Sequence, residues 1–77
     1  MNTKELQLIA DLLVKAHGDE IAREGDWWYG IDGHDFNIHS PNDDGMFHIN
    51  VYPHDEATGT DYTQWIDLQP VFLGVTA

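Results

Sequence analysis

Two kinds of residue are scarce in this chain: it has no cysteine at all, and it has no lysine or arginine after Arg23. Without cysteine there is no disulfide and no Cys/His zinc pattern to stabilise a small core, and the chain fits a reducing compartment. The three permanent cations, Lys4, Lys15 and Arg23, lie in the first third, whereas residues 24–77 carry ten carboxylates and the formal net charge is −11. A surface so dominated by one sign repels nucleic acid and anionic membranes and attracts basic protein surfaces.

The chain also lacks a long apolar segment. No apolar run approaches 18 residues, so no membrane-spanning helix is predicted. Residues Met1 to Glu5 lack the basic region and the small-residue cleavage site of a signal peptide. We therefore expect a cytoplasmic protein without membrane contact. Its 77 residues predict a single domain, residues 1–77, with room for one hydrophobic core.

Motifs for catalysis are absent as well. There is no cysteine nucleophile, no GxSxG sequence and no glycine-rich phosphate loop, and no lysine or arginine stands near the acidic region to hold an anionic substrate. The run from Asp32 to Asp35 places an acid and a base together, but a turn explains these residue types. A domain of this size offers little room for a pocket of several hundred cubic ångströms. We expect neither enzymatic activity nor a cofactor.

The first part of the chain predicts the helical segment of the fold, residues 3–24. Asn2 or Thr3 can cap a helix, and apolar residues then recur at helical spacing. The apolar stripe contains Leu6, Ile9, Ala10 and Leu13, and Leu12, Val14 and Ala16 widen it. Gly18 favours a helix end, so we expect the first helix to end near His17 and a short helical turn to follow up to Gly25. A single, slightly bent helix is the alternative.

From Trp27 the periodicity changes to two, which indicates β-strands. Asp32-Gly33 is a strong signal for a two-residue hairpin turn, because both residues tolerate positive φ. The turn predicts a register with Ile31 opposite His34, Tyr29 opposite Phe36 and Trp27 opposite Ile38. Apolar residues then meet on one side of the hairpin, and a slip of one residue would undo this agreement.

A second turn, over residues 40–45, leads to a third strand of alternating apolar and polar residues, 47–52. We expect Pro53 to end this strand, because proline cannot donate to a central ladder. A polar loop then runs over residues 54–60. Residues 62–68 favour a fourth strand through their β-branched and aromatic content, and a short helix is the alternative there.

The sum is an α+β fold in which the helical segment, residues 3–24, packs on an antiparallel β-meander of three to four strands, residues 27–68. Residues 69–77 form a C-terminal segment that adds an edge strand or tucks under the core. The helix is expected to cover the face made by Trp27, Tyr29, Ile31, Phe36, Ile38, Phe47, Ile49 and Val51. The opposite face would carry Trp28, Asn37, His39, His48 and Asn50. Whether Tyr52 belongs to this face is left open.

Two histidines of that opposite face raise the alternative of a metal site. In one of two registers of the second hairpin, His39 and His48 lie directly opposite, with about 5 Å between their Cβ atoms. Such a spacing suits two imidazole ligands on one ion. A third ligand would have to come from His34, His54 or an aspartate, and no HExxH-type motif is present. Ordinary polar strand residues are the simpler interpretation of both histidines.

The carboxylates gather at predicted turns and edges, which points to protein binding. Trp28 is the one large aromatic that the register places outside the helix-covered face, unless the segment around Phe72 covers it. An exposed tryptophan ringed by carboxylates has the composition of an interface hot spot with a charged rim. The expected partner-binding residues are Trp28, Asp32, Asp35, Asp43, Asp44, Asp55, Glu56 and Asp61.

In size, acidity and predicted architecture the whole chain resembles the small acidic DNA-mimic inhibitors of phages and mobile elements, including some anti-CRISPR proteins. No motif carries this resemblance. It implies a stoichiometric inhibitor, monomeric or a small homo-oligomer in a bacterial host, that blocks a basic nucleic-acid-binding protein or complex without binding nucleic acid itself. An immunity protein or antitoxin that neutralises a basic nuclease is the nearest alternative, and a histidine metal-binding module is another.

Overall fold

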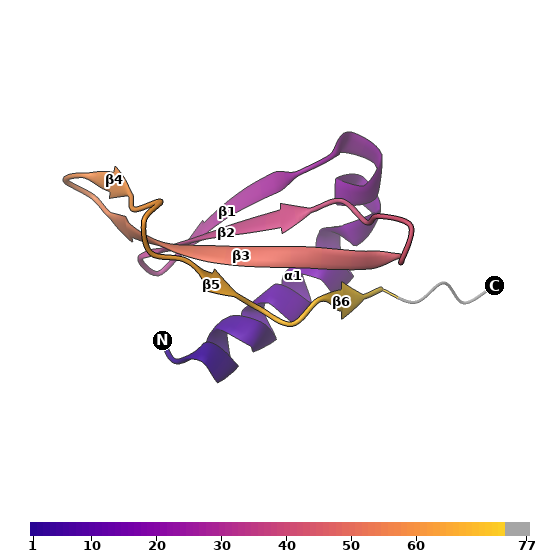
Figure 1. Cartoon of the computed structure of the whole chain (residues 1–77), viewed down its shortest axis with the longest axis horizontal. Coiled ribbons are helices and arrows are strands. Elements are labelled where there is room, and N and C mark those ends of the chain that lie inside the picture. Colours follow the sequence, from indigo (N-terminus) through magenta and orange to yellow (C-terminus); the bar gives the residue numbers. More distant parts are fainter. Residues whose placement is uncertain (74–77) are drawn as a thin grey trace.

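A single helix lies against one face of an antiparallel sheet in the computed structural model, which describes residues 1–73 (Figure 1). The helix α1 spans Thr3–Glu24, and the strands are β1 (Trp27–Ile31), β2 (His34–His39), β3 (Met46–Asp55), β4 (Gly59–Thr60), β5 (Ile66–Asp67) and β6 (Val71–Phe72). β1, β2 and β3 are neighbours in that order, and β4, β5 and β6 all pair with β3. The fold is α+β, as the sequence predicts.

The two ends of α1 are defined by a capping box and by a glycine. The Asn2 side chain accepts a hydrogen bond from the Glu5 N–H at 2.9 Å, and the Glu5 carboxylate accepts one from the Asn2 N–H at 3.4 Å. At the other end, Gly25 takes a φ of 100° and donates to the carbonyl of Ile21. Within residues 1–73, no helix has the length and apolar character needed to cross a membrane.

The expected break at Gly18 is wrong, because α1 runs through this residue as one helix. Gly18 is buried against the sheet: a Cβ placed on it would lie 3.0 Å from Leu73 Cδ2 and 3.4 Å from Phe47 Cζ. The glycine is therefore explained by close packing of side chains on the helix backbone rather than by a helix end. Ile21 continues the buried face beyond it.

The β1–β2 hairpin has the register that its turn predicts. Asp32 and Gly33 have φ angles of 48° and 74°, both in the left-handed region that a type I′ turn requires. The observed pairs are Trp27 with Ile38, Tyr29 with Phe36 and Ile31 with His34. The turn therefore decides which side chains of the hairpin face the helix.

β3 is longer than the sequence predicts, because Pro53 lies within it rather than at its end. Pro53 is the last β3 residue paired with β2, where it lies opposite His34, and its carbonyl accepts a hydrogen bond from the Asp61 N–H at 2.9 Å. Beyond Pro53 the strand turns to a new partner, β4. The expected polar loop over residues 54–60 is thus a projecting hairpin, which we call the arm (Figure 1).

The last part of the described chain follows β3 in two short strands. Of the strand expected over residues 62–68, only β5 forms. Before it, one Asp61 carboxylate oxygen accepts hydrogen bonds from the N–H and the hydroxyl of Thr63 at 2.9 and 2.5 Å, which closes a turn. β6 is the edge segment expected of the C-terminal residues. Residues 74–77 lie outside the described part.

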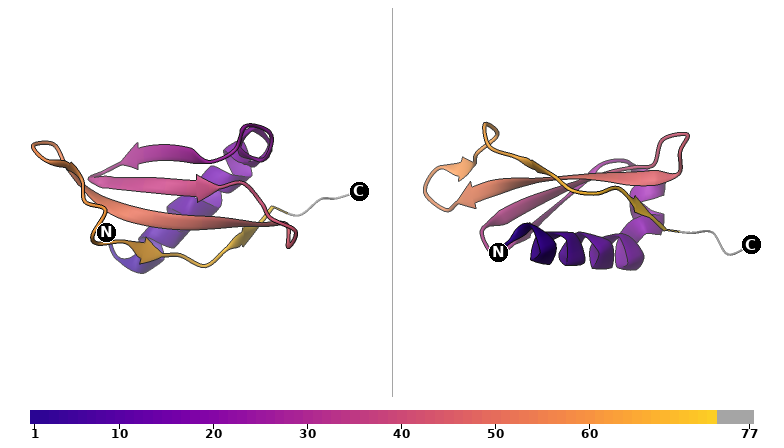
Figure 2. Two further views of the ribbon diagram at one scale, coloured as in Figure 1. Left: turned by 45° about the horizontal axis from the view of Figure 1, so that its top comes forward. Right: turned by 60° about the horizontal axis from the view of Figure 1, so that its bottom comes forward.

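The core lies between α1 and the sheet, and the other face of the sheet has no helix over it (Figure 2). The buried apolar residues are Leu6, Ala10, Val14, Ile21, Phe36, Ile38, Phe47, Ile49, Val51 and Leu68. Tyr29 and Ile31 pack against this core but are only partly buried. The helix covers Trp27 less than expected. This residue, at the start of the edge strand β1, is 37% exposed.

We predict that Gly18→Val destabilises the protein by about 1–3 kcal/mol, because the new side chain would collide with Phe47 and Leu73 in a packed interface. Ala16→Val is the matched control, since it adds the same kind of side chain to an exposed position of α1 and should cost less than about 1 kcal/mol. Urea unfolding of both variants measures the difference. Equal stabilities would show that the helix is not closely packed at Gly18.

Candidate protein-binding face

The sheet face that points away from α1, here called the outer face, carries polar and aromatic side chains. Because side chains alternate along a strand, the buried residues of β1, β2 and β3 determine which residues point outward. The outer face contains Trp28 and Gly30 of β1, Asp35, Asn37 and His39 of β2, and His48, Asn50, Tyr52 and His54 of β3. The residues expected on this face are all found there, and Tyr52, which the sequence left open, joins them.

Three aromatic side chains pack together on the outer face. The Trp28 ring centroid lies 5.6 Å from that of Tyr52 and 6.3 Å from that of Tyr62. Since β2 separates β1 from β3, the Trp28 ring crosses β2 to reach Tyr52, and this explains why the outward-facing Asn37 is buried. Trp28 and Tyr62 are still 47% and 63% exposed. Trp28 is therefore not the only large aromatic here, and its ring partners are these tyrosines rather than Phe72.

Asp35 lies beside this aromatic cluster, directly opposite Tyr52 on the neighbouring strand. Its Oδ2 accepts hydrogen bonds from the Thr60 hydroxyl and from His54 Nδ1, the latter at 2.8 Å. Burial raises the pKa of Asp35, but these hydrogen bonds outweigh burial and hold the pKa below its ordinary value. Asp35 is thus a fixed negative charge at neutral pH. His54 Nδ1 also lies 3.4 Å from the Thr60 hydroxyl oxygen, whose hydrogen is donated to Asp35, so the three side chains form one cluster.

A second polar chain crosses the outer face from the residue before β1 to β5. Asp26 Oδ2 lies 3.0 Å from His39 Nδ1, and His39 Nε2 lies 3.1 Å from Asn50 Oδ1. The Asn50 amide nitrogen donates to Asp67 Oδ1 at 2.6 Å, which fixes the orientation of the amide. His39 thus links the Asp26 carboxylate to the Asn50 side-chain amide across the outer face.

Of the two registers open for the second hairpin, the structure has the one in which His39 lies opposite His48, but it does not supply the ligand set of a metal site. The two residues are paired across β2 and β3. Each ring, however, contacts an aspartate. His39 contacts Asp26, and His48 Nε2 lies 3.2 Å from the Asp44 carboxylate. Within residues 1–73, no three histidine or acidic side chains are grouped as a metal site would require. The structure therefore gives no support to this alternative.

The acidic turns lie at opposite ends of the sheet. Asp43 and Asp44 are in the turn between β2 and β3, and Asp55 and Glu56 are in the arm at the far end of β3. β3 has ten residues, so the two acidic ends are about 30 Å apart at roughly 3.3 Å per residue. The structure therefore spreads the expected partner-binding residues along the sheet instead of gathering them in one patch.

Two further acidic residues, Asp32 and Asp61, lie in turns at the same end as the arm. The pKa of Asp61 is lowered by hydrogen bonds from the Thr63 hydroxyl and N–H. At the other end, the hydrogen bond from the Met46 N–H is the main cause that lowers the pKa of Asp44. Backbone and hydroxyl donors thus favour the ionised form of carboxylates at both ends of the sheet.

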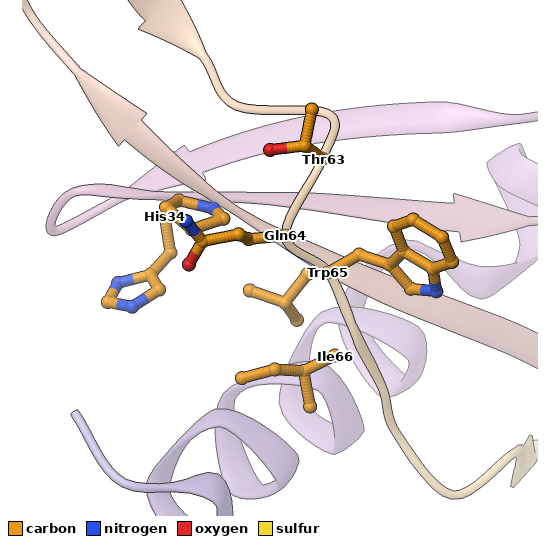
Figure 3. Close-up of a pocket in the computed structure, with 7 residues that line it drawn as sticks. His34, Thr63, Gln64, Trp65 and Ile66 are labelled. Atoms are coloured by element: carbon orange, nitrogen blue, oxygen red, sulfur yellow. The ribbon is translucent and has the colours of Figure 1, made fainter.

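A groove opens on the other side of the sheet, near the ends of β2 and β3 (Figure 3). Its volume is about 460 Å³, which is more than the short chain led us to expect, and it is lined by His34, Val51, Pro53, Thr63, Gln64, Trp65 and Ile66. This lining includes one histidine and no carboxylate, lysine or arginine, so it has no acid–base pair and no fixed charge with which to hold a charged ligand. The outer face is the better candidate because charge and exposed aromatic surface coincide there.

Sequence reasoning missed part of the outer face. The signal for Tyr52 was present, since the period of two along β3 already pointed it outward. Tyr62 and Asp67 come from a segment whose path depends on the Asp61 turn and on pairing with β3, which no local pattern reveals. Asp26 joins the face through His39, which is 13 residues away in the chain.

We predict that Asp35→Asn lowers the free energy of unfolding near pH 7 by about 1–3 kcal/mol, because hydrogen bonds to a charged acceptor are lost. Since folding lowers the pKa of Asp35, its contribution is complete above the ordinary carboxyl pKa of about 3.9 and is lost as pH falls through the folded value. The gap between wild type and variant should therefore close on acidification.

Urea unfolding at a series of pH values from 7 to 2 measures this gap. Glu56→Gln is the control, because it removes the same charge from an exposed position of the arm and should change stability by less than about 0.5 kcal/mol. A gap between wild type and Asp35→Asn that stays constant down to pH 2 would contradict the predicted role of the ionised carboxylate.

The chain was compared with known proteins in three ways. No protein-family model, no curated protein and no solved structure matches it. No relative therefore bears on the resemblance to DNA-mimic inhibitors. What bears on function is the chain's own outer face, with its ionised carboxylates, its exposed aromatic rings and its lack of lysine and arginine.

Proposed function

We propose that this protein binds a basic nucleic-acid-binding protein or complex and blocks its nucleic-acid site by charge mimicry. An anti-CRISPR protein that acts on a CRISPR effector complex would be one instance. The observation that carries the proposal is the outer face together with the turns at its ends, where carboxylates accompany exposed aromatic rings and the ion pairs found within residues 1–73 are all formed by histidines.

The density of negative charge along the sheet supports this proposal. The carboxylates of the outer face, its end turns and the arm are Asp26, Asp32, Asp35, Asp43, Asp44, Asp55, Glu56, Asp61 and Asp67. Over a length of about 30 Å this is on average one charge per roughly 3 Å, which is close to the one charge per 3.4 Å of helix axis that each strand of duplex DNA carries. A groove built to hold one phosphate backbone would therefore meet a comparable number of negative charges.

The state of these charges supports mimicry as well. The pKa values of Asp35, Asp44 and Asp61 are all lowered, so these groups stay ionised at the pH at which nucleic acid is bound. A one-signed field accelerates encounter with a basic partner and makes the rate depend on salt. Nucleic acid itself is repelled by the same field.

The aromatic cluster supplies the contact that charge alone does not. Surface ion pairs are worth little each, about 0–1 kcal/mol, because water and salt screen them. Exposed tryptophan and tyrosine are the residues most often found at the energetic centre of an interface. Trp28 and Tyr62 present such surface in the middle of the acidic outer face, between its two charged ends.

Competition with DNA tests the proposal directly. Immobilised basic nucleases and CRISPR effector complexes are exposed to the protein at low and high salt, with and without duplex DNA. We expect at least one to bind, with affinity that falls with salt and with loss of binding when DNA is added. If nothing in such a panel binds, or if bound DNA leaves binding unchanged, the proposed function is wrong. A toxin nuclease as the target would favour the immunity-protein alternative.

Removing the charges of one acidic end should slow association. We predict that Asp43→Asn with Asp44→Asn lowers the association rate severalfold and weakens its dependence on salt, because rim charges act mainly on encounter. Asp19→Asn with Glu20→Gln removes two charges from exposed positions of α1 and should leave the rate near that of the wild type. Stopped-flow mixing with the partner at several salt concentrations compares the two. Equal effects would show that net charge matters and the location of charge does not.

Removing the central aromatic should weaken the complex once it has formed. We predict that Trp28→Ala lowers affinity by about 30-fold or more, the loss typical of a hot spot. Trp65→Ala is the matched control, since Trp65 is 55% exposed but lines the groove on the other side of the sheet. Calorimetric titration gives the affinities, and thermal unfolding checks that both variants fold. Loss of stability without a separate loss of affinity would place Trp28 outside the interface.

A further inference from the structure

Asp35 uses one carboxylate oxygen for the fold and leaves the other open. Oδ2 accepts the hydrogen bonds from Thr60 and His54, whereas no residue within 1–73 donates to Oδ1. The side chain is only 16% exposed and its charge is held in place by Oδ2. Oδ1 is therefore an oriented acceptor on an ionised group that is already largely shielded from water.

Gly30 leaves an open space next to this oxygen. It is opposite Asp35 in the β1–β2 ladder, and a Cβ placed on it would lie 3.4 Å from Asp35 Oδ1. Gly30 is not among the residues with positive φ, so its backbone conformation does not require glycine. A glycine inside a strand costs stability and often marks a place where a ligand or another chain comes close to the backbone.

The aromatic cluster lies on the same face of the sheet as this space, which we call the Gly30 niche. Trp28 is two residues before Gly30 on the same face of β1, about 7 Å along the strand. Its ring leans over β2 toward Tyr52, which flanks Asp35 on the other side. The niche thus combines a glycine within a strand, a carboxylate oxygen without a donor in residues 1–73, and a neighbouring indole that is 47% exposed.

The geometry points to the Gly30 niche as a binding site for one arginine side chain of the basic partner, an inference that rests on the proposed function. A guanidinium can donate to Asp35 Oδ1 while its plane lies on Trp28, which joins a charge-assisted hydrogen bond to a cation–π contact. β1 is an edge strand, so some of its backbone carbonyls lack a strand partner and can accept the remaining N–H groups. Lysine fits less well, because its ammonium group is compact, strongly hydrated and cannot stack.

A peptide titration tests the niche without any partner protein. The probe is acetyl-Gly-Arg-Gly-amide, added to ¹⁵N-labelled protein while amide and indole resonances are recorded. We expect saturable shifts at the Gly30 amide and the Trp28 indole, with a dissociation constant in the millimolar range that cation–π and ion-pair contacts of this kind imply. The same peptide with citrulline in place of arginine should produce no saturable shift, and the lysine peptide should bind severalfold more weakly.

Two variants locate the binding. Gly30→Val fills the niche without changing any charge or aromatic ring, and it should reduce affinity for the arginine peptide roughly tenfold or more. Asp35→Asn should have a similar effect. Thr58→Val, which adds an apolar side chain to the exposed arm, is the control for Gly30→Val and should bind as the wild type does.

The results separate this inference from the proposed function. Peptide binding that survives Gly30→Val, or shifts spread over the acidic turns without saturation, would overturn the niche, while DNA competition on a basic partner could still succeed. Saturable binding that is lost in Gly30→Val and kept in Thr58→Val supports the niche. The failure of every basic protein to bind in the competition experiment would instead remove the proposed function, whatever the peptide does.

Discussion

The two-residue turn at Asp32-Gly33 is the constraint on which the rest of the structure depends. With both residues at positive φ, it fixes which residues of β1 and β2 lie opposite one another. That register sends Phe36 and Ile38 into the core and Trp28 and Asp35 to the outer face. A shift of one residue would bury Asp35 without its partners and expose Phe36. Core and candidate binding face are thus two consequences of one local choice.

Features that depend on neighbouring residues are predicted from the sequence, whereas features that depend on contacts between distant segments are not. The hairpin register follows from adjacent residues and is confirmed. Gly18 was expected to end the helix, because the sequence does not show that the side chains of Phe47 and Leu73 pack against this residue. Pro53 was expected to end β3, because the sequence does not show that this residue lies in the last pair between β2 and β3, opposite His34. Tyr62, one of the two tyrosines whose rings contact Trp28, escapes prediction for the same reason, since it follows a turn.

Because the sheet has no lysine or arginine, its carboxylates accept hydrogen bonds from other donors. Their partners are backbone N–H groups, threonine hydroxyls and histidines, such as Thr60 and His54 at Asp35 or Met46 at Asp44. These donors fix the orientation of a carboxylate and, except for a protonated histidine, leave its charge in place, whereas an arginine would cancel it. The negative potential of the outer face therefore extends into solvent, where ions or a cationic partner can balance it.

Exposed apolar surface alone does not identify a binding site in so small a protein, since Leu8 and Leu12 on α1 are 57% and 65% exposed as well. The outer face differs because its exposed ring, Trp28, lies next to a carboxylate that the fold has already oriented and partly shielded from water. Shielding strengthens an electrostatic contact, and orientation reduces what a partner must spend in entropy to form it. Two properties that each cost stability in isolation, an exposed indole and a glycine within a strand, occur together beside Asp35. Their coincidence, more than the number of acids, is what makes recognition of a cationic side chain the better explanation of this face.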